Sequence, residues 1–181
     1  GSEMCIRDRV VSMVQTLSDF FRASLNSGKD IVSLEGECRH ITSYLQIQQV
    51  RYQDILTYDV DIPEEIANCK IPKITLQPLV ENALYHGIKN KRGKGRIVVT
   101  GRREKDKCVI RVEDNGIGMT KERLNQVRGG LTTKIEDSND FYGLYNVNER
   151  IRLKFGEEYG LSIDSVLQEG TCVEVWLPWE S

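Results

Sequence analysis

Hydrophobic residues recur along the chain with two different periods. Over residues 10–25 they return every three or four positions, which is the spacing of an amphipathic helix. The stretch 26–28, Asn-Ser-Gly, then ends that helix, and Ser33 can cap a second one whose apolar positions continue to Tyr52. Two helices of this size cannot bury their apolar stripes alone. We therefore predict that they form one arm of a helical bundle.

A period of two, typical of strands, begins near residue 55. Alternating positions predict strands over 55–62, 95–102, 108–114, 161–166 and 172–177, whereas the helical period returns over 74–88, 121–128 and 144–155. Residues 129–143 are polar and contain glycine, with few apolar anchors, so we predict a mobile loop there. Strands and helices in this order predict an α+β fold in which helices cover one face of a mixed sheet.

Composition narrows the class of protein. Apolar residues make up 39% of the chain, charged residues 29%, and the formal net charge is −2, so we expect a soluble segment and no nucleic-acid partner. No window approaches the roughly 18 apolar residues of a membrane span. The opening Gly1-Ser2 reads as a cloning scar, and residues 1–9 are expected to be such a scar or disordered. The basic stretch 89–96 lacks Walker-loop spacing and is expected to be a solvated connection, with a secondary contact to phosphates as the alternative.

Cysteine and histidine do not predict a metal centre. The five cysteines are an odd number, are widely spaced, and form no Cys-x-x-Cys pair, so we expect reduced thiols. The two histidines, His40 and His86, have no cysteine or histidine at zinc-ligand spacing. We expect His40 to be a structural or surface residue of the second helix.

The stretch "VEDNGIGM", residues 112–119, ends a strand on a carboxylate followed by two glycines. A period of two puts Asp114 on the same side as Ile110 and Val112; facing the core, that carboxylate needs a hydrogen-bond donor. Gly116 and Gly118 lack a Cβ and can bring backbone close to a ligand. Asp-Asn-Gly is also a common turn signal, so this stretch alone leaves a plain turn open.

The helix in "LQPLVENALYHGI" adds a second candidate. Its apolar face consists of Leu76, Leu79, Val80, Ala83 and Leu84. Asn82 therefore points away from the core, and its side-chain carbonyl oxygen suits Mg²⁺, which takes few protein ligands. A solvated asparagine is the alternative.

Together, "LVENALYHG", "DNGIGM", "YGLYN" and "EGTCVEV" resemble the ATP-binding domain of sensor histidine kinases, whose Bergerat fold also occurs in gyrase-type ATPases, Hsp90-type chaperones and mismatch-repair proteins. "LSDFFRASL" and "ECRHITSYLQIQQVRYQD" resemble the bacterial two-component subfamily whose phosphoacceptor lies in an Asn-Pro-His-Phe motif. The resemblance covers residues 10–178. It implies that residues 10–54 are the C-terminal part of the dimerisation and phosphotransfer helices, and that residues 55–181 form a Bergerat-type catalytic domain.

The resemblance also implies roles for individual residues. Asp114 would accept a hydrogen bond from the adenine amino group, and Asn82 would hold Mg²⁺ on the ATP phosphates. Gly143 lies at the end of the ATP lid, where helix-start amides suit phosphate, and the hydroxyl of Thr171, after Gly170, would lie near Asp114, joined to it through water. The implied nucleotide-binding residues are Asn82, Tyr85, His86, Asp114, Gly116, Gly118, Met119, Gly143, Leu144 and Thr171. No catalytic residue is assigned with them; Glu81 is a candidate base or metal-orienting group.

Three departures from the family pattern qualify these implications. Phe141 stands where the lid motif usually has glycine, and Tyr85 stands where many relatives carry lysine. No Asn-Pro-His-Phe is present, so the chain is expected to bind ATP and Mg²⁺ without phosphorylating itself. The implied reaction moves the ATP γ-phosphoryl to a histidine outside this chain and then to a response regulator.

The resemblance further implies a homodimer for the full-length protein, with a monomer open for this chain alone. It implies a cytoplasmic domain of a membrane-anchored sensor, with membrane contact only through missing upstream segments. A non-catalytic nucleotide-sensing or interaction module of the same fold remains the alternative. A gyrase-type or chaperone-type ATPase is disfavoured, because those enzymes usually place a glutamate four residues before the metal asparagine, where this chain has Pro78.

Overall fold

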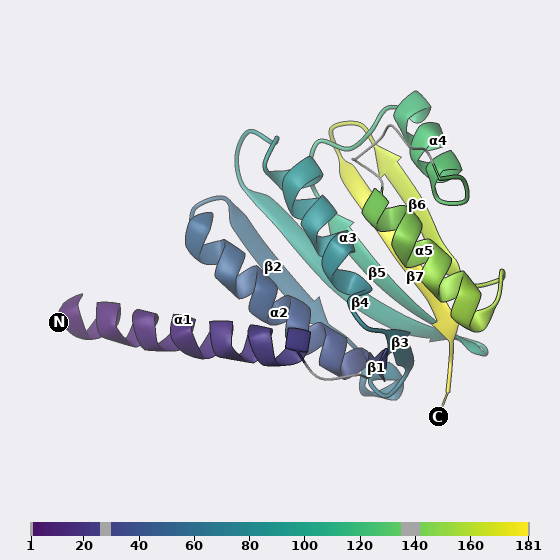
Figure 1. The fold of residues 1–181 in the computed structure, drawn as a ribbon. Coiled ribbons are helices and arrows are strands. Elements are labelled where there is room, and N and C mark those ends of the chain that lie inside the picture. The colour runs from purple at the N-terminus through teal and green to yellow at the C-terminus, as the bar shows by residue number, and fades with distance from the viewer. Residues whose placement is uncertain (1, 26–29, 135–141, 181) are drawn as a thin grey trace.

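A mixed five-stranded sheet with helices on one face organises the chain (Figure 1). The computed structural model describes residues 2–25, 30–134 and 142–180. The sheet order is β2-β4-β5-β7-β6. Its strands are β2 (Leu56–Asp61), β4 (Gly95–Glu104), β5 (Lys107–Asp114), β6 (Gly160–Val166) and β7 (Gly170–Pro178). β2 runs parallel to β4, and the other neighbouring strands are antiparallel. The predicted α+β class is thereby confirmed.

The helices follow the predicted periods closely, except at their ends. They are α1 (Ser2–Leu25), α2 (Leu34–Arg51), the short 3-10 turn η1 (Glu64–Ile66), α3 (Leu76–Asn82), the π-helical segment η2 (Ala83–Ile88), α4 (Lys121–Gly130) and α5 (Tyr142–Phe155). α1 begins at Ser2 and therefore includes residues 2–9, whereas the interpretation of residues 1–9 as a cloning scar or disordered segment stays a prediction. The predicted loop over 129–143 is shorter, since α4 and α5 extend into it; residues 135–141 lie outside the described residues.

One apolar core joins α2 to the sheet. Leu34, Ile41 and Leu45 of α2 are fully buried and belong to the same cluster as Ile97 of β4 and Ile110 of β5. Packing thus runs across the predicted domain boundary after residue 54, which stays a prediction. The small antiparallel sheet of β1 (Ile31–Ser33) and β3 (Lys70–Pro72) was not predicted, because three residues are too few to display a period.

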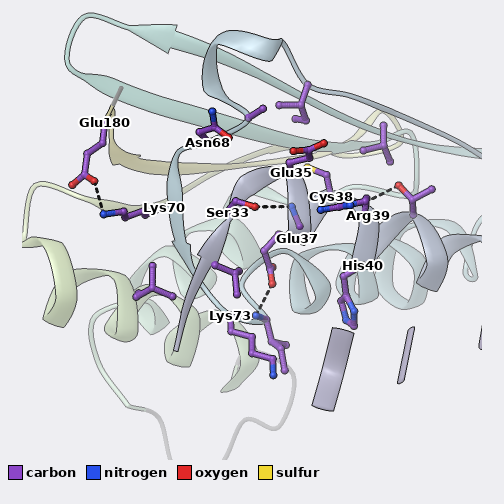
Figure 2. A pocket seen from close by; sticks show the side chains of 18 of the residues that line it. Ser33, Glu35, Glu37, Cys38, Arg39, His40, Asn68, Lys70, Lys73 and Glu180 are labelled. Carbon is purple, nitrogen blue, oxygen red and sulfur yellow. Dashed lines mark hydrogen bonds and ion pairs between the residues drawn. The ribbon is translucent and has the colours of Figure 1, made fainter. Parts of the chain in front are cut away.

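Two polar side chains fix the start of α2 (Figure 2). The Ser33 hydroxyl accepts a hydrogen bond of 3.1 Å from the Gly36 N–H, which confirms the predicted cap. The buried Glu37 carboxylate accepts hydrogen bonds from the backbone N–H groups of Ile74, Thr75 and Leu76, at 2.8, 3.1 and 3.2 Å. Glu37 thereby satisfies the free amides at the start of α3 and couples α2 to that helix.

Glu37 also stabilises an unusual backbone conformation at Ile74. Ile74 has φ of 58°, a left-handed value that a β-branched residue rarely adopts. Its N–H is bound by Glu37 and its carbonyl accepts a bond of 2.9 Å from Arg150 of α5. The cost of this conformation is offset by the packing of three helices around it.

Replacing Glu37 by glutamine is expected to lower the free energy of unfolding by about 2 kcal/mol, since hydrogen bonds to a charged acceptor contribute roughly 1.5–3 kcal/mol. Urea denaturation followed by circular dichroism measures the change. Glu35→Gln, at an exposed position in the same turn, is the matched control and should leave the midpoint unchanged. Equal midpoints for both variants would contradict this role of Glu37.

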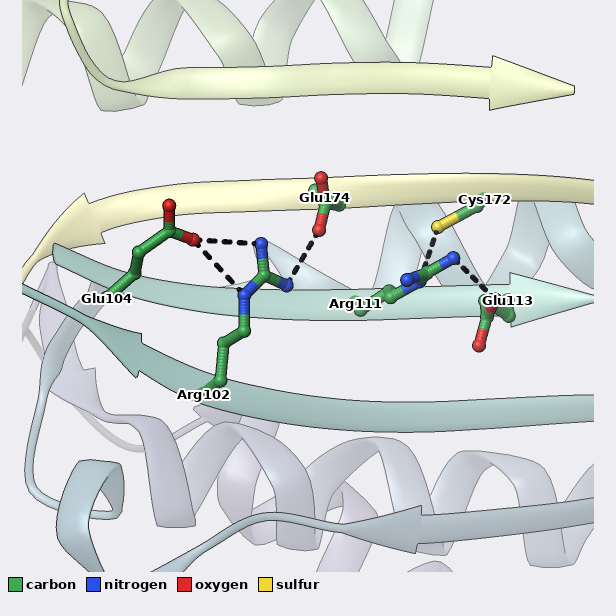
Figure 3. Close-up of polar contacts among 6 residues, drawn as sticks. All are labelled: Arg102, Glu104, Arg111, Glu113, Cys172 and Glu174. Carbon is green, nitrogen blue, oxygen red and sulfur yellow. Dashed lines mark hydrogen bonds and ion pairs between the residues drawn. The ribbon is translucent and has the colours of Figure 1, made fainter.

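The face of the sheet away from the helices is polar (Figure 3). Arg102 bonds Glu104 at 3.1 Å and Glu174 at 2.9 Å, while Arg111 pairs with Glu113 at 2.8 Å. Pairs of this exposure contribute little to stability. Their consequence is architectural: charged side chains keep this face in water, so the core lies entirely between the sheet and the helices.

Candidate functional site

Asp114, the last residue of β5, faces the helix layer. Its Oδ1 accepts a hydrogen bond of 2.8 Å from the Gly116 N–H, and a Cβ built on Gly87 of η2 would stand 2.6 Å from the same oxygen. Burial raises the pKa of Asp114 from its ordinary value of 3.8 to about 6, although the backbone N–H groups of Gly116 and Thr171 oppose the shift. A partly buried carboxylate with spare acceptor capacity therefore lies at the C-terminal end of the central strand.

The loop after β5 is clamped between two elements. A Cβ on Gly116 would lie 2.4 Å from the Gly87 backbone, and one on Gly118, whose φ is 64°, would lie 2.0 Å from the Val166 carbonyl oxygen. The Ile117 N–H donates to the Gly87 carbonyl at 3.3 Å, and the Gln168 N–H donates to the Ile117 carbonyl at 2.7 Å. No side chain beyond hydrogen fits at the two glycines, so the bare backbone there is a requirement of packing.

Ser165 of β6 links three parts of this region. Its hydroxyl accepts from the Met119 N–H at 2.9 Å, donates to the Gly170 carbonyl at 3.0 Å, and lies 2.8 Å from the Thr171 hydroxyl. Thr171 faces Asp114 across the β5–β7 pair. The Met119 side chain packs against the core. Neither Ser165 nor Gly87 was among the predicted site residues; Gly87 ends the quoted motif "LYHG", whereas Ser165 carries no local signal.

The helix α3–η2 passes beside both ends of the candidate site. Pro78 lies four residues before Asn82 and Gly87 five after it, which is about one helical turn in each direction. Gly87 is against Asp114, and a Cβ built on Gly143, at the start of α5, would stand 3.8 Å from the Pro78 Cβ. Asn82 therefore lies between the carboxylate and the beginning of α5. The predicted single helix over 74–88 is instead an α-helix that widens into a π-helical turn.

The other predicted site residues lie on or near the α3–η2 helix. Asn82 is partly exposed, and His86 is exposed. Tyr85 is 38% exposed, and its ring centroid lies 5.6 Å from Lys89 Nζ. Leu144 is buried in the core. Phe141 lies outside the described residues.

Two family models match the chain. One, described as the histidine kinase-, DNA gyrase B- and HSP90-like ATPase, matches residues 72–181, and one described as histidine kinase matches residues 3–56. The chain belongs to the histidine kinase-, gyrase- and HSP90-like ATPase family. The residues of this ATPase family domain include the whole of α3–η2, the Asp114 loop and the start of α5.

Relatives of the family domain are sensor proteins. Sensor histidine kinase YesM of Bacillus subtilis is 36% identical over 171 residues, covering 94% of this chain and 28% of YesM. Sensor histidine kinase BtsS of Escherichia coli is 33% identical over 172 residues, covering 95% of this chain and 28% of BtsS. The chain thus spans less than a third of the length of these relatives.

Solved structures share the fold of the family domain. The histidine kinase domain of an Erythrobacter litoralis blue-light activated kinase aligns with a TM-score of 0.60 at 15% identity, covering 92% of this chain and 73% of that one. The catalytic domain of histidine kinase ThkA aligns with a TM-score of 0.61 at 10% identity, covering 82% of this chain and 96% of that one. At these identities the likeness is one of architecture.

Nothing in the described ranges forms a metal site from protein ligands alone. No group of three or more His, Cys, Asp or Glu side chains is placed to hold an ion in that part of the ATPase-family chain. A single partly exposed amide oxygen fits Mg²⁺ that takes its remaining ligands from phosphate and water. It does not fit an ion held by the protein alone.

A hollow of about 1670 Å³ lies away from these residues, around the start of α2 (Figure 2). None of the predicted nucleotide-binding residues lines it. Its rim carries both charges, including the ion pair Lys70–Glu180 at 3.3 Å. It is therefore not assigned to the nucleotide. Separately, none of the helices that the structure describes has the length and apolarity needed to cross a membrane.

Proposed function

We propose that this chain is the ATP-binding catalytic part of a two-component sensor histidine kinase. The observation that carries the proposal is Asp114, a partly buried carboxylate against Gly87 and Gly116, in a chain that belongs to the ATPase family. Because the matched relatives are more than three times longer, the activity of the whole protein is part of the proposal.

Base recognition falls to the loop after β5. In the proposed complex the Asp114 carboxylate accepts a hydrogen bond from the adenine amino group, and Gly116 and Gly118 let backbone approach the base. Thr171 supports the carboxylate across the β5–β7 pair, and its hydroxyl is oriented by Ser165. Met119 closes the loop beside them through its backbone bond to Ser165.

Phosphate binding falls to the other end of the site. Asn82 would hold Mg²⁺ through its amide oxygen, and the bound ion would neutralise phosphate charge. The N–H groups at the start of α5, at Gly143 and Leu144, suit an anionic phosphate. His86 and Tyr85 lie on η2, the continuation of the same helix, and both are exposed.

The acceptor histidine lies outside this chain. His40 is 5% exposed, stacked on Phe20 and bonded to Gln77, which leaves no path for a phosphoryl group. We propose that the acceptor belongs to the Asn-Pro-His-Phe subfamily motif and passes the phosphoryl group to a response regulator. We also propose that the whole protein is a membrane-anchored sensor and that this part lies in the cytoplasm.

The proposed homodimer is supported by α1. Ile6, Val10 and Val14 recur every four residues and are 60%, 57% and 57% exposed. An apolar stripe of this kind on a helix needs a partner in water. A second copy of the chain is the proposed partner in the full-length protein.

The metal role of Asn82 can be measured directly. Mg²⁺ is expected to strengthen ATP binding, and Asn82→Ala should remove about tenfold of that gain, roughly 1.4 kcal/mol. Calorimetric titrations with ATP, in Mg²⁺ and in chelator, give the two affinities. Asn125→Ala, at an exposed position of α4, is the matched control. A folded wild-type chain that fails to bind ATP would overturn the proposed function and favour the interaction-module alternative.

A further inference from the structure

Four side chains from three helices form a continuous line that ends at Glu81, on the helix that carries Asn82. The Phe20 ring of α1 stacks on the His40 ring of α2, with centroids 4.6 Å apart and an interplanar angle of 16°. His40 Nε2 lies 2.6 Å from Gln77 Oε1, and Gln77 Nε2 donates to Glu81 Oε1 at 2.8 Å. Glu81 is the residue before Asn82. The line therefore connects α1 to the helix of the candidate ATP site.

The Glu81 carboxylate, at the end of this line, determines the direction of every hydrogen bond in it. A carboxylate oxygen accepts, so the Gln77 amide must present its NH₂ to Glu81 and its carbonyl oxygen to His40. His40 Nε2 must then carry the proton that it donates to Gln77. His40 Nδ1 is buried and has no hydrogen-bond partner among the described residues. Buried polar atoms without partners are uncommon. The hydrogen bond from His40 Nε2 to Gln77 is therefore the interaction that accounts for a histidine at this position.

The contacts around this line divide it into two parts. One part is built on the rigid pair of helices α2 and α3, and the other depends on the position of α1. Glu37 anchors α2 to the start of α3, so the His40–Gln77 geometry is built on a rigid pair of helices. Phe20 comes from α1, which extends away from the sheet and crosses α2 (Figure 1). The same Phe20 ring lies 6.3 Å from the Tyr44 ring. Contact with α1 thus involves two residues of α2, one of which, His40, is bonded to α3.

We propose that His40 and Gln77 are positioning residues that hold the Glu81 carboxylate in place beside Asn82, and that the Phe20 stack makes this arrangement depend on the position of α1. This inference rests on the proposed function, since Asn82 must hold the metal for Glu81 to influence it. Hydrogen bonds weaken steeply with distance and misalignment, so a small displacement of α1 is sufficient to release Glu81. Asn82 would hold Mg²⁺, and the Glu81 carboxylate, held by Gln77 one residue away on the same helix, would accept hydrogen bonds from waters of such an ion.

The test combines nucleotide binding with the spectrum of the imidazole. Three variants each break one link: Phe20→Ala, His40→Phe, which keeps an aromatic ring, and Gln77→Met, which keeps the length. Gln49→Met is the matched control, because Gln49 also lies on α2 and donates one hydrogen bond, of 3.1 Å to the Leu56 carbonyl, away from α3. Affinities for ATP with Mg²⁺, for ATP in chelator and for adenosine are measured by calorimetry.

The three variants are expected to weaken Mg²⁺-dependent ATP binding about threefold to tenfold and to leave adenosine binding unchanged. Gln49→Met should match the wild type. The chain has only two histidines, so nitrogen NMR can follow His40 directly. The wild type should show one tautomer protonated at Nε2, and Gln77→Met should lose that preference.

Each other outcome overturns a defined statement. Folded variants that keep the full gain from Mg²⁺ overturn the positioning role while leaving the proposed function standing. A wild-type chain that does not bind ATP overturns both. If Gln77→Met does not fold, His40→Phe and Phe20→Ala decide the question, and equal loss of adenosine and ATP binding in them indicates general disruption and overturns the role.

Discussion

Asp114→Asn is expected to weaken ATP binding about 30-fold to 100-fold at neutral pH, because a hydrogen bond to a charged acceptor contributes roughly 1.5–3 kcal/mol and the amide presents a mismatched NH₂ to the adenine amine. Calorimetry with the purified chain measures the loss. The matched control is Glu113→Gln, one residue earlier on the opposite, water-exposed face, where the side chain pairs with Arg111. Equal affinities for wild type and Asp114→Asn would show that another group reads the base.

The pH dependence of binding follows from the same carboxylate. Burial raises the pKa of Asp114 to about 6, so the accepting form is lost as the pH falls through that value, and wild-type affinity should fall with it. Asp114→Asn lacks this group and should lack this step. The nucleotide phosphates titrate equally in both experiments, so the difference in ATP affinity between the two proteins across the pH range reports Asp114 alone.

Stability should change in the opposite sense to binding. A folded pKa raised from 3.8 to about 6 means that the folded chain binds the proton more tightly than the unfolded chain. The resulting stabilisation is present below pH 3.8 and is lost as the pH rises through 6. At neutral pH the charged carboxylate therefore costs stability, and Asp114→Asn should unfold at an equal or higher urea concentration than the wild type. Lost binding in a more stable variant cannot come from unfolding.

Gly116→Ala is expected to lower the free energy of unfolding by about 3 kcal/mol and to abolish tight ATP binding. The added Cβ would stand 2.4 Å from the Gly87 Cα and carbonyl carbon, which are backbone atoms that cannot rotate away. Relieving the overlap requires the loop to separate from η2, and overpacking of this kind costs roughly 1–3 kcal/mol or more. Urea denaturation and calorimetry measure the two effects.

Gly129→Ala is the control for the glycine variant. Gly129 lies in α4, and a Cβ there meets no atom within 4 Å. The exchange should stabilise the chain by up to about 1 kcal/mol, since alanine favours a helix over glycine. If Gly116→Ala behaves like Gly129→Ala, the close approach of the loop to η2 does not exist in solution.

Much of this molecule was predictable because it depends on local pattern. The alternation in β5 put Asp114 on the side of Ile110 and Val112, and the structure has all three facing the helices. The three-and-four spacing of α3–η2 identified its buried face correctly, and Ser33 was recognised as a cap. Such features depend on residues within a few positions of one another, so the order of the side chains alone determines them.

The start of the chain was less predictable. Residues 2–9 contain no apolar stripe of their own, and Ile6 is 60% exposed. Their pattern therefore did not predict that α1 begins at Ser2. β1 and β3 hold three residues each and are defined by their pairing with one another. Each of these two strands exists because the other lies beside it.

By itself, the sequence determined the strands of the five-stranded sheet, the helices that cover it, the inward carboxylate and the motifs of the ATPase family. Only the tertiary structure decided that the helix widens into a π turn that puts Gly87 against Asp114, that Ser165 joins Met119 to Thr171, and that His40 reaches Glu81 through Gln77. The physical reason is range. Periodicity is set by the geometry of consecutive peptide units, whereas the Met119–Ser165 and His40–Gln77 contacts join residues 46 and 37 positions apart and arise only after the sheet and helices have packed together.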